Sequence, residues 1–252
     1  MKFGFLITAF ENVEQTLQNI RHIRGYPRLG KSQICVVSTT ENQQVIDKFN
    51  SLLYTEGLQP LILKIIRDTP GNSTNPWEPP KQDYINWRHK WLPPRILKSF
   101  DVGFNLLYES GIDVALHLHS DTFWHNTYEA ETKLMVEAEK SYEAYAGYWD
   151  LCIEDNWLGV HPHPEGILID IGFFKHMGIL PFFNCYGDPN FVHWNWGSPE
   201  SLIANWCHYK ITGICLKEHE KPKQIFLNMF RARMSRTYHG NWDHLVNLEG
   251  VQ

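Results

Sequence analysis

The sequence lacks paired cysteine spacing, an excess of positive charge and long apolar runs. Its five cysteines are an odd number without a CxxC motif, which argues against a disulfide framework or a zinc knuckle and favours a reducing compartment. Lysine and arginine number 23 against 28 acidic residues, and the formal charge of −5 disfavours a nucleic acid partner. No window reaches the ~20 apolar residues of a membrane span, and the opening run meets Glu11 too early for a signal peptide. We therefore expect a cytoplasmic protein, with peripheral membrane association and oligomeric state left open.

Histidine and tryptophan are abundant instead. The 252 residues include 13 histidines and 10 tryptophans, and 43% of the chain is hydrophobic, which is enough for a sizeable core. Both side chains combine an apolar body with a polar tip and often occur in metal sites and ring-stacking pockets. The composition thus predicts one globular domain over residues 1–252 with a site for a small molecule.

The first half of the chain alternates strand and helix patterns. KFGFLITAF is a continuous apolar run typical of a buried strand, and NVEQTLQNIRHIRGY has apolar residues at helical spacing up to Gly25. The order repeats with a strand at 33–40, a helix at 42–57 and a strand at 59–68. This alternation predicts an α/β fold with a mostly parallel central sheet flanked by helices.

The rest of the chain becomes progressively less regular. Residues 69–94 contain six prolines and three tryptophans and are expected to form a long ordered loop over the sheet. We expect helices at 95–111 and 127–146, a strand at 113–119, a strand and short helix at 166–180, a loop at 184–200, a helix from Ser198 to Gly213, a strand at 214–219 and no clear pattern over 221–252.

The strand VALHLH runs directly into Ser120 and Asp121. In an extended chain His119 and Asp121 lie on the same side and Ser120 on the other, so an imidazole and a carboxylate can converge on one ligand. These donors suit Mn²⁺ or another divalent cation, and a nucleotide diphosphate can complete the coordination. The alternative is that Asp121 caps the next helix and His119 is an interior histidine; His117 is expected to pack in the core.

In order and pattern, residues 3–220 resemble the GT-A nucleotide-sugar glycosyltransferases and are similar to glycosyltransferase family two. FLITAFENVEQTLQNIRHI is similar to their first strand and helix, and RILKSFDVGFNLLYESGIDVALHLHSD to the helix and strand before the DxD motif. GILIDIGFFKHMGIL with WGSPESLIANWCHYKITGICLKE is similar to the acceptor-side segment. The resemblance implies a nucleotide-sugar half at about 1–125, an irregular acceptor half at about 126–220 and a tail at 221–252.

The resemblance also implies roles for individual residues. Asp121 matches the metal-binding position of DxD, whereas His119 replaces the first aspartate and is nominated as a ligand on its chemistry. Glu200 matches the base of the ED signature in inverting enzymes, with the alternative that it is a favourable charge in the first helical turn. His239 resembles a late histidine that some GT-A enzymes add at the metal or pyrophosphate.

Further residues are candidates for binding donor and acceptor. Loop threonines, acids and solvated helix charges are common, and aromatic residues often pack together, so each also has a purely structural explanation. The candidates are Thr8, Phe10, Glu11 and Thr39 for the nucleoside, Arg95 and Lys98 for phosphate, and His161, His163, His193, Trp194 and Trp196 for the acceptor pocket.

The leading hypothesis is a metal-dependent glycosyltransferase. It uses Mn²⁺ or Mg²⁺ and a nucleotide-sugar donor, acts on a carbohydrate, lipid-linked or protein-linked hydroxyl acceptor with inversion, and belongs to polysaccharide biosynthesis by resemblance only. Two alternatives stay open. One is a non-haem iron oxygenase with His119, Asp121 and His193 or His239 as its triad, and the other is a non-catalytic nucleotide-sugar or carbohydrate binder.

Overall fold

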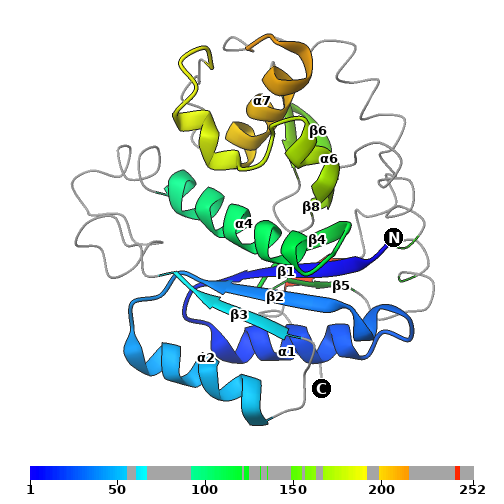
Figure 1. The fold of residues 1–252 in the computed structure, drawn as a ribbon, viewed down its shortest axis with the longest axis vertical. Helices are drawn as coiled ribbons and strands as arrows, with labels where there is room; N and C mark the ends of the chain where they lie inside the picture. Colours follow the sequence, from blue (N-terminus) through cyan, green and yellow to red (C-terminus); the bar gives the residue numbers. More distant parts are fainter. Residues whose placement is uncertain are drawn as a thin grey trace.

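A five-stranded sheet in the order β3-β2-β1-β4-β8 forms the centre of the fold (Figure 1). The computed structural model describes residues 1–55, 61–66, 92–120, 122–124, 131, 135, 149–154, 157–162, 167–191, 199–215 and 242–244. The first four strands in chain order pair in parallel and the fifth is antiparallel. They are β1 (Phe3–Ala9), β2 (Gln33–Ser38), β3 (Leu61–Ile65), β4 (Val114–His119) and β8 (Ile167–Asp170). The predicted α/β class with a mostly parallel sheet is confirmed.

Helices cover both faces of this sheet (Figure 1). One face packs against α1 (Val13–Arg24) and α2 (Gln43–Thr55), where a core forms around Phe5, Ile20 and Phe49. The other face packs against α4 (Leu92–Glu109), with a second core of aromatic and aliphatic side chains. The strands read as continuous apolar runs because both faces are buried.

The helix α4 starts three residues before its expected first residue. Pro93 and Pro94 lie in its first turn, where a proline needs no donor partner and its fixed φ suits the helix. Along its length Leu107 lies against Gly4 and Gly103 against Leu6. The helix therefore runs opposite to the strands, and its first turn lies at the carboxyl edge of the sheet.

A third layer lies over the outer side of α4 (Figure 1). It contains α6 (Ile171–His176), the 3₁₀ turn η2 (Phe182–Tyr186) and α7 (Pro199–Thr212). Trp206 of α7 is buried and donates its indole N–H to Ile179 O at 2.8 Å. Gly213, with φ of +71°, ends α7 as expected.

Two predictions from the sequence, the loop at 184–200 and the strand at 214–219, are wrong at their first residues. The segment 184–200, expected to be a loop, begins inside η2, because Asp101 on α4 accepts hydrogen bonds from two backbone N–H groups of this turn. Ile214 and Cys215 do not begin a strand. The carbonyl of Ile214 accepts a 2.9 Å hydrogen bond from Nδ1 of His208 and so turns back onto α7.

Two small antiparallel pairs were not expected from the sequence. One joins β6 (Trp149–Glu154) to β7 (Trp157–Pro162), and the other joins β5 (Thr122–Trp124) to β9 (Trp242–His244). The second pair brings the C-terminal tail beside the segment that follows Asp121. None of the helices in the described parts of the chain is both long and apolar enough to cross a bilayer.

Replacing Asp101 by asparagine should weaken the attachment of η2 to α4. The two carboxyl oxygens of Asp101 accept from Phe182 N at 2.6 Å and from Phe183 N at 2.8 Å, and in asparagine one of these oxygens is replaced by an NH2 group that cannot accept. We expect the free energy of unfolding to fall by about 1–3 kcal/mol at acidic pH, where the carboxyl group of Asp101 is protonated and its contribution is largest. Urea unfolding measures the loss, with Asp47→Asn on the exposed side of α2 as the matched control.

The difference between wild type and Asp101→Asn should also depend on pH. Burial raises the pKa of Asp101 to about 7 from 3.8, against the opposing effect of its two backbone hydrogen bonds. A raised pKa means that this group stabilises the fold fully below pH 3.8 and that the contribution is lost as the pH rises through about 7. The difference in the free energy of unfolding between wild type and Asp101→Asn should therefore become smaller as the pH rises from 3.8 to about 7. A difference that stays constant over this range would contradict the raised pKa of Asp101.

Candidate functional site

The order in which the chain adds strands to the sheet reverses between β1 and β4. The chain runs outward from β1 to β2 and β3, and then returns through α4 to place β4 on the other side of β1. Because α1 and α4 cover opposite faces, the carboxyl ends of β1 and β4 border the switch point where open α/β sheets bind ligands. Register pairing sets Thr8 opposite His119 at this point.

Two asparagines of α1 and its preceding turn hold the end of β4 from one face. Asn19 Nδ2 donates to His119 O at 3.1 Å, and Asn12 Nδ2 donates to Ser120 Oγ. The backbone N–H of Ser120 donates to Thr8 O at 3.0 Å. Ser120 is buried toward α1, so the prediction that it lies on the side opposite His119 is confirmed.

Three polar side chains, those of Thr8, His117 and His119, lie together on the α4 face of the same strands. Thr8 and His119 are half-buried, and between them His117 is fully buried, as expected for a core histidine. Its Nε2 lies 2.8 Å from Thr8 Oγ1, and its ring centroid lies 5.1 Å from that of His119 at an angle of 78°. Burial, and to a smaller extent His119, lower the pKa of His117 well below its usual range, so its imidazole is neutral.

The turns after β1 and β2 are joined by hydrogen bonds. Ser38 Oγ donates to Phe10 O at 2.7 Å, and Thr40 Oγ1 donates to Glu11 Oε1 at 3.1 Å. Thr39, half-buried, donates its backbone N–H to the carbonyl of Ala9 at 3.2 Å. The fold therefore brings the nucleoside candidates Thr8, Phe10, Glu11 and Thr39 to the same edge, while their role in binding stays a prediction.

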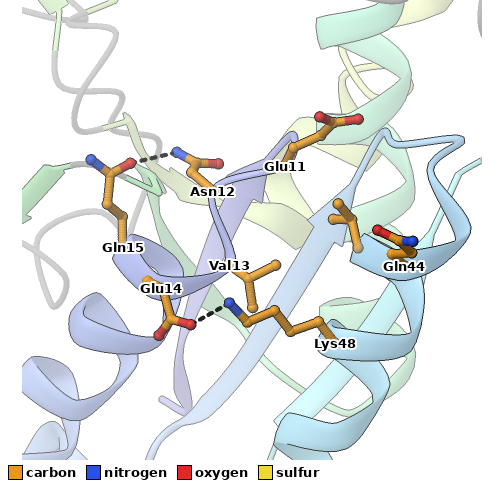
Figure 2. A pocket seen from close by; sticks show the side chains of 8 residues that line it. Glu11, Asn12, Val13, Glu14, Gln15, Gln44 and Lys48 are labelled. Atoms are coloured by element: carbon orange, nitrogen blue, oxygen red, sulfur yellow. Dashed lines mark hydrogen bonds and ion pairs between the residues drawn. The ribbon is translucent and has the colours of Figure 1, made fainter.

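A pocket of about 410 Å³ opens beside these turns (Figure 2). It lies between the first turns of α1 and α2, and an ion pair between Glu14 and Lys48 joins the two helices across it. Asn12 donates to Gln15 Oε1 at 3.0 Å on its other side. The lining residues are Glu11, Asn12, Val13, Glu14, Gln15, Gln44, Val45 and Lys48.

The two phosphate candidates on α4 have different surroundings. Arg95 belongs to the first turns of the helix, near the carboxyl edge of the sheet, and is only 9% exposed. Lys98 is half-buried, and its Nζ lies 5.3 Å from the centroid of the Phe183 ring in η2. Arg95 is thus the better positioned of the two for a ligand at the switch point.

Several candidates fall where side chains are not described. His161 belongs to β7 and Glu200 is the second residue of α7, and these two elements pack together. The register Thr122 to His244 places the tail beside the residue after Asp121. The nominated residues Asp121, His163, His193, Trp194, Trp196 and His239 lie outside the described residues.

The nominated metal ligands include only one described side chain, that of His119. In the parts of the chain that the structure describes, no three or more histidine, cysteine, aspartate or glutamate side chains gather into a group that would hold a metal. The donor set is nevertheless suitable. The half-buried His119 is fixed through its backbone by Asn19, and an imidazole nitrogen with the carboxylate of Asp121 suits a borderline cation.

Sequence reasoning missed Asn12, Asn19 and Ser120 as supports of the site. Asn19 carried a signal, since it falls at the buried spacing of α1 among apolar residues and is 0% exposed. Asn12 precedes the helix as a capping residue would, yet it makes no capping bond and instead contacts Ser120. A buried amide on an apolar helix face is therefore the observable signal.

No protein-family model matches the chain, and no curated protein matches it in sequence. Solved structures that it is similar to include the galactosyltransferase LgtC in complex with donor and acceptor sugar analogues, at 8% identity and a TM-score of 0.48 over 96% of this chain and 86% of that chain. The mannosyltransferase PcManGT from Pyrobaculum calidifontis, in complex with GDP-Man and Mn²⁺, matches at 9% identity and a TM-score of 0.44 over 70% of this chain. TarS of S. aureus matches at 10% identity and a TM-score of 0.43 over 83% of this chain.

This chain spans 34% of the TarS chain and 46% of the PcManGT chain. Glycosyltransferases, expected from the resemblance in sequence, are therefore among the structures that it is similar to. Because these TM-scores are below 0.5, the similarity carries no argument about function, which depends on the chain's own residues.

Replacing Asn12 by alanine should separate the turn after β1 from the end of β4. The variant loses the bonds that Asn12 donates to Ser120 Oγ and Gln15 and the one that it accepts from Phe10 N, and it leaves the buried Ser120 hydroxyl without its donor. We expect the free energy of unfolding to fall by about 1–2 kcal/mol in urea titrations. Gln15→Ala removes only one of these three bonds and is the matched control, and equal losses in both variants would contradict the importance of the contact with Ser120.

Proposed function

We propose that this chain is a metal-dependent glycosyltransferase that transfers a sugar from a nucleotide-diphosphate donor to a hydroxyl acceptor with inversion. The observation that carries the proposal is the register of β1 with β4, in which Thr8 and His119 face each other at the carboxyl edge of the sheet. This edge borders the switch point between helices on opposite faces, where α/β sheets bind nucleotides.

The donor nucleoside would bind at the turns after β1 and β2. Phe10 offers a ring for stacking, and Glu11 and Thr39 offer polar atoms to the base and ribose. Arg95 and, farther along α4, Lys98 would contact the diphosphate. A guanidinium in the first turns of a helix combines its own charge with the positive end of the helix dipole, and both stabilise an anion.

His119 and Asp121 would hold the divalent cation, with His239 as a further ligand. Asp121 directly follows Ser120 in the sequence. Just before it, Asn12 donates a hydrogen bond to the Ser120 hydroxyl and Asn19 donates one to the backbone carbonyl of His119. When bound, a divalent cation neutralises the negative charge that develops on the leaving diphosphate.

The acceptor would approach from the side of α7. Glu200, in the first turn of that helix, would accept the proton of the acceptor hydroxyl as this oxygen attacks the anomeric carbon. The helix dipole favours its ionised form, which is the form that can accept a proton. His161, His163, His193, Trp194 and Trp196 would form the walls of the sugar pocket, because aromatic faces pack well against the apolar faces of sugars.

The mostly parallel sheet disfavours the oxygenase alternative. Iron oxygenases with this triad are built on antiparallel double-stranded β-helices, whereas four strands here pair in parallel. A non-catalytic binder would share the donor site and differ only in turnover. The experiments below distinguish it from an enzyme.

Donor binding should raise the apparent stability of the protein in a metal-dependent way. A thermal-shift screen would test UDP, GDP, UDP-GlcNAc and GDP-mannose with and without Mn²⁺. At a ligand concentration near 100 times Kd, we expect the correct nucleotide to raise Tm by about 5–10 °C. Asp121→Ala should lose the part of the shift that needs Mn²⁺, and Asp47→Ala on α2 should keep it. A full Mn²⁺-dependent shift in Asp121→Ala would refute the metal assignment.

Glu200→Gln should retain donor binding but lose turnover. Removal of a general base typically lowers kcat by about 10²–10⁴-fold, and the amide cannot accept the proton. Product analysis by NMR should show inversion at the anomeric carbon, and Glu109→Gln on the exposed end of α4 serves as the control. Retention of configuration would remove Glu200 from this role, and binding without transfer or hydrolysis would support the non-catalytic alternative.

A further inference from the structure

The buried imidazole of His117 contacts both half-exposed side chains at the switch point. We propose that His117 is a positioning residue that orients the Thr8 hydroxyl and the His119 ring toward the donor crevice. This inference rests on the proposed function, since it assigns these two side chains to ligand binding. It adds a role for a residue that the sequence pattern assigned to the core alone.

The contacts of His117 run in two directions. Its Nε2 lies 2.8 Å from Thr8 Oγ1 on the neighbouring strand β1. Its ring meets the His119 ring edge to face, with centroids 5.1 Å apart and planes at 78°. Thr8 and His119 are themselves partners in the β1–β4 register, so one buried ring contacts both members of a cross-strand pair.

The ring of His117 cannot turn freely. Phe100 of α4 packs against it with centroids 4.3 Å apart, and the side chain is 0% exposed. From the other face of the sheet, Asn19 fixes the carbonyl of His119. Thr8 and His119 are the partly exposed residues that His117 contacts at this edge of the sheet.

The hydrogen-bonding pattern favours one tautomer. Nδ1 of His117 has no hydrogen-bond partner among the described residues, and a buried N–H without an acceptor is more costly than an unpaired lone pair. A proton on Nε2 would donate to Thr8 Oγ1 and leave only a lone pair at Nδ1. The hydroxyl of Thr8 would then keep its own proton for a ligand oxygen, such as a hydroxyl or phosphate oxygen of the donor.

A structural role alone does not explain a histidine here. The side chain is fully buried and packs against Phe100, and a leucine of similar volume would fill the position without desolvating two ring nitrogens. Buried polar groups that reduce stability often serve a site. Substitution of His117 should therefore separate stability from binding.

The test compares His117→Leu and Thr8→Val with wild type. Thermal unfolding measures stability, the electron paramagnetic resonance of free Mn²⁺ measures metal binding, and calorimetry with UDP and with GDP in Mn²⁺ measures nucleotide binding. We expect His117→Leu to keep or raise Tm while raising the nucleotide Kd about five- to tenfold, the effect of one hydrogen bond. Thr8→Val should give a similar loss, and the double variant little more than either alone, because both remove the same bond.

Leu116→Ala is the matched control, since Leu116 is a buried residue of the same strand that faces α1. It should lower Tm and leave each Kd within about twofold. The proposal is overturned if His117→Leu binds nucleotide and Mn²⁺ as wild type does. It is also overturned if His117→Leu loses binding only together with Tm, or if the effects of the Thr8 and His117 variants simply add.

Failure of the proposed function has a different outcome. If wild type binds neither Mn²⁺ nor a nucleotide, or if His119→Ala binds both as wild type does, the donor site itself is wrong. The tautomer still tests His117 in that case, by ¹⁵N-detected NMR of the histidine rings without ligand. A proton on Nε2 whose signal shifts in Thr8→Val supports the positioning contact, and a proton on Nδ1 overturns it.

Discussion

Parallel pairing of β1 with β4 is the constraint on which the other features of this molecule depend. It sets the carboxyl ends of two strands side by side although more than 100 residues separate them in the chain. Because the chain leaves β1 into α1 on one face and enters β4 from α4 on the other, the two helices diverge at this edge. The switch point at the ends of these strands therefore follows from the connectivity of the chain.

Residues 117–120 are held from both sides of the sheet. On the α1 side, the amides of Asn12 and Asn19 bind a hydroxyl and a carbonyl; on the α4 side, His117 contacts Thr8 and packs against Phe100. Buried polar contacts of this kind are strong in a low dielectric and tolerate little displacement. The polypeptide that leads into Asp121 is therefore rigid at the point where the proposed chemistry needs a fixed geometry.

The sequence predicted those elements whose pattern is local and strongly periodic. The buried strands and amphipathic helices from β1 to β3, α4 with β4, and α7 ending at Gly213 were all expected. The β6–β7 and β5–β9 pairs were missed because short strands without clear alternation carry little local signal, and Thr122 pairs with a residue more than 100 positions away. The contacts of Asn12 and His117 were missed for a related reason. Each depends on a side chain of a neighbouring strand, which spacing within one segment does not reveal.

Gly103 fixes how closely α4 approaches the sheet. A Cβ at this position would lie 2.2 Å from Leu6 Cδ1, so the helix axis sits at a depth that no other amino acid permits without displacement. Arg95 lies eight residues earlier on the same rigid rod, about 12 Å along its axis. The missing side chain of Gly103 thus sets the distance between the helix and the sheet. Through the rigid helix it also sets, about two turns away, the height of the Arg95 backbone above the strand ends.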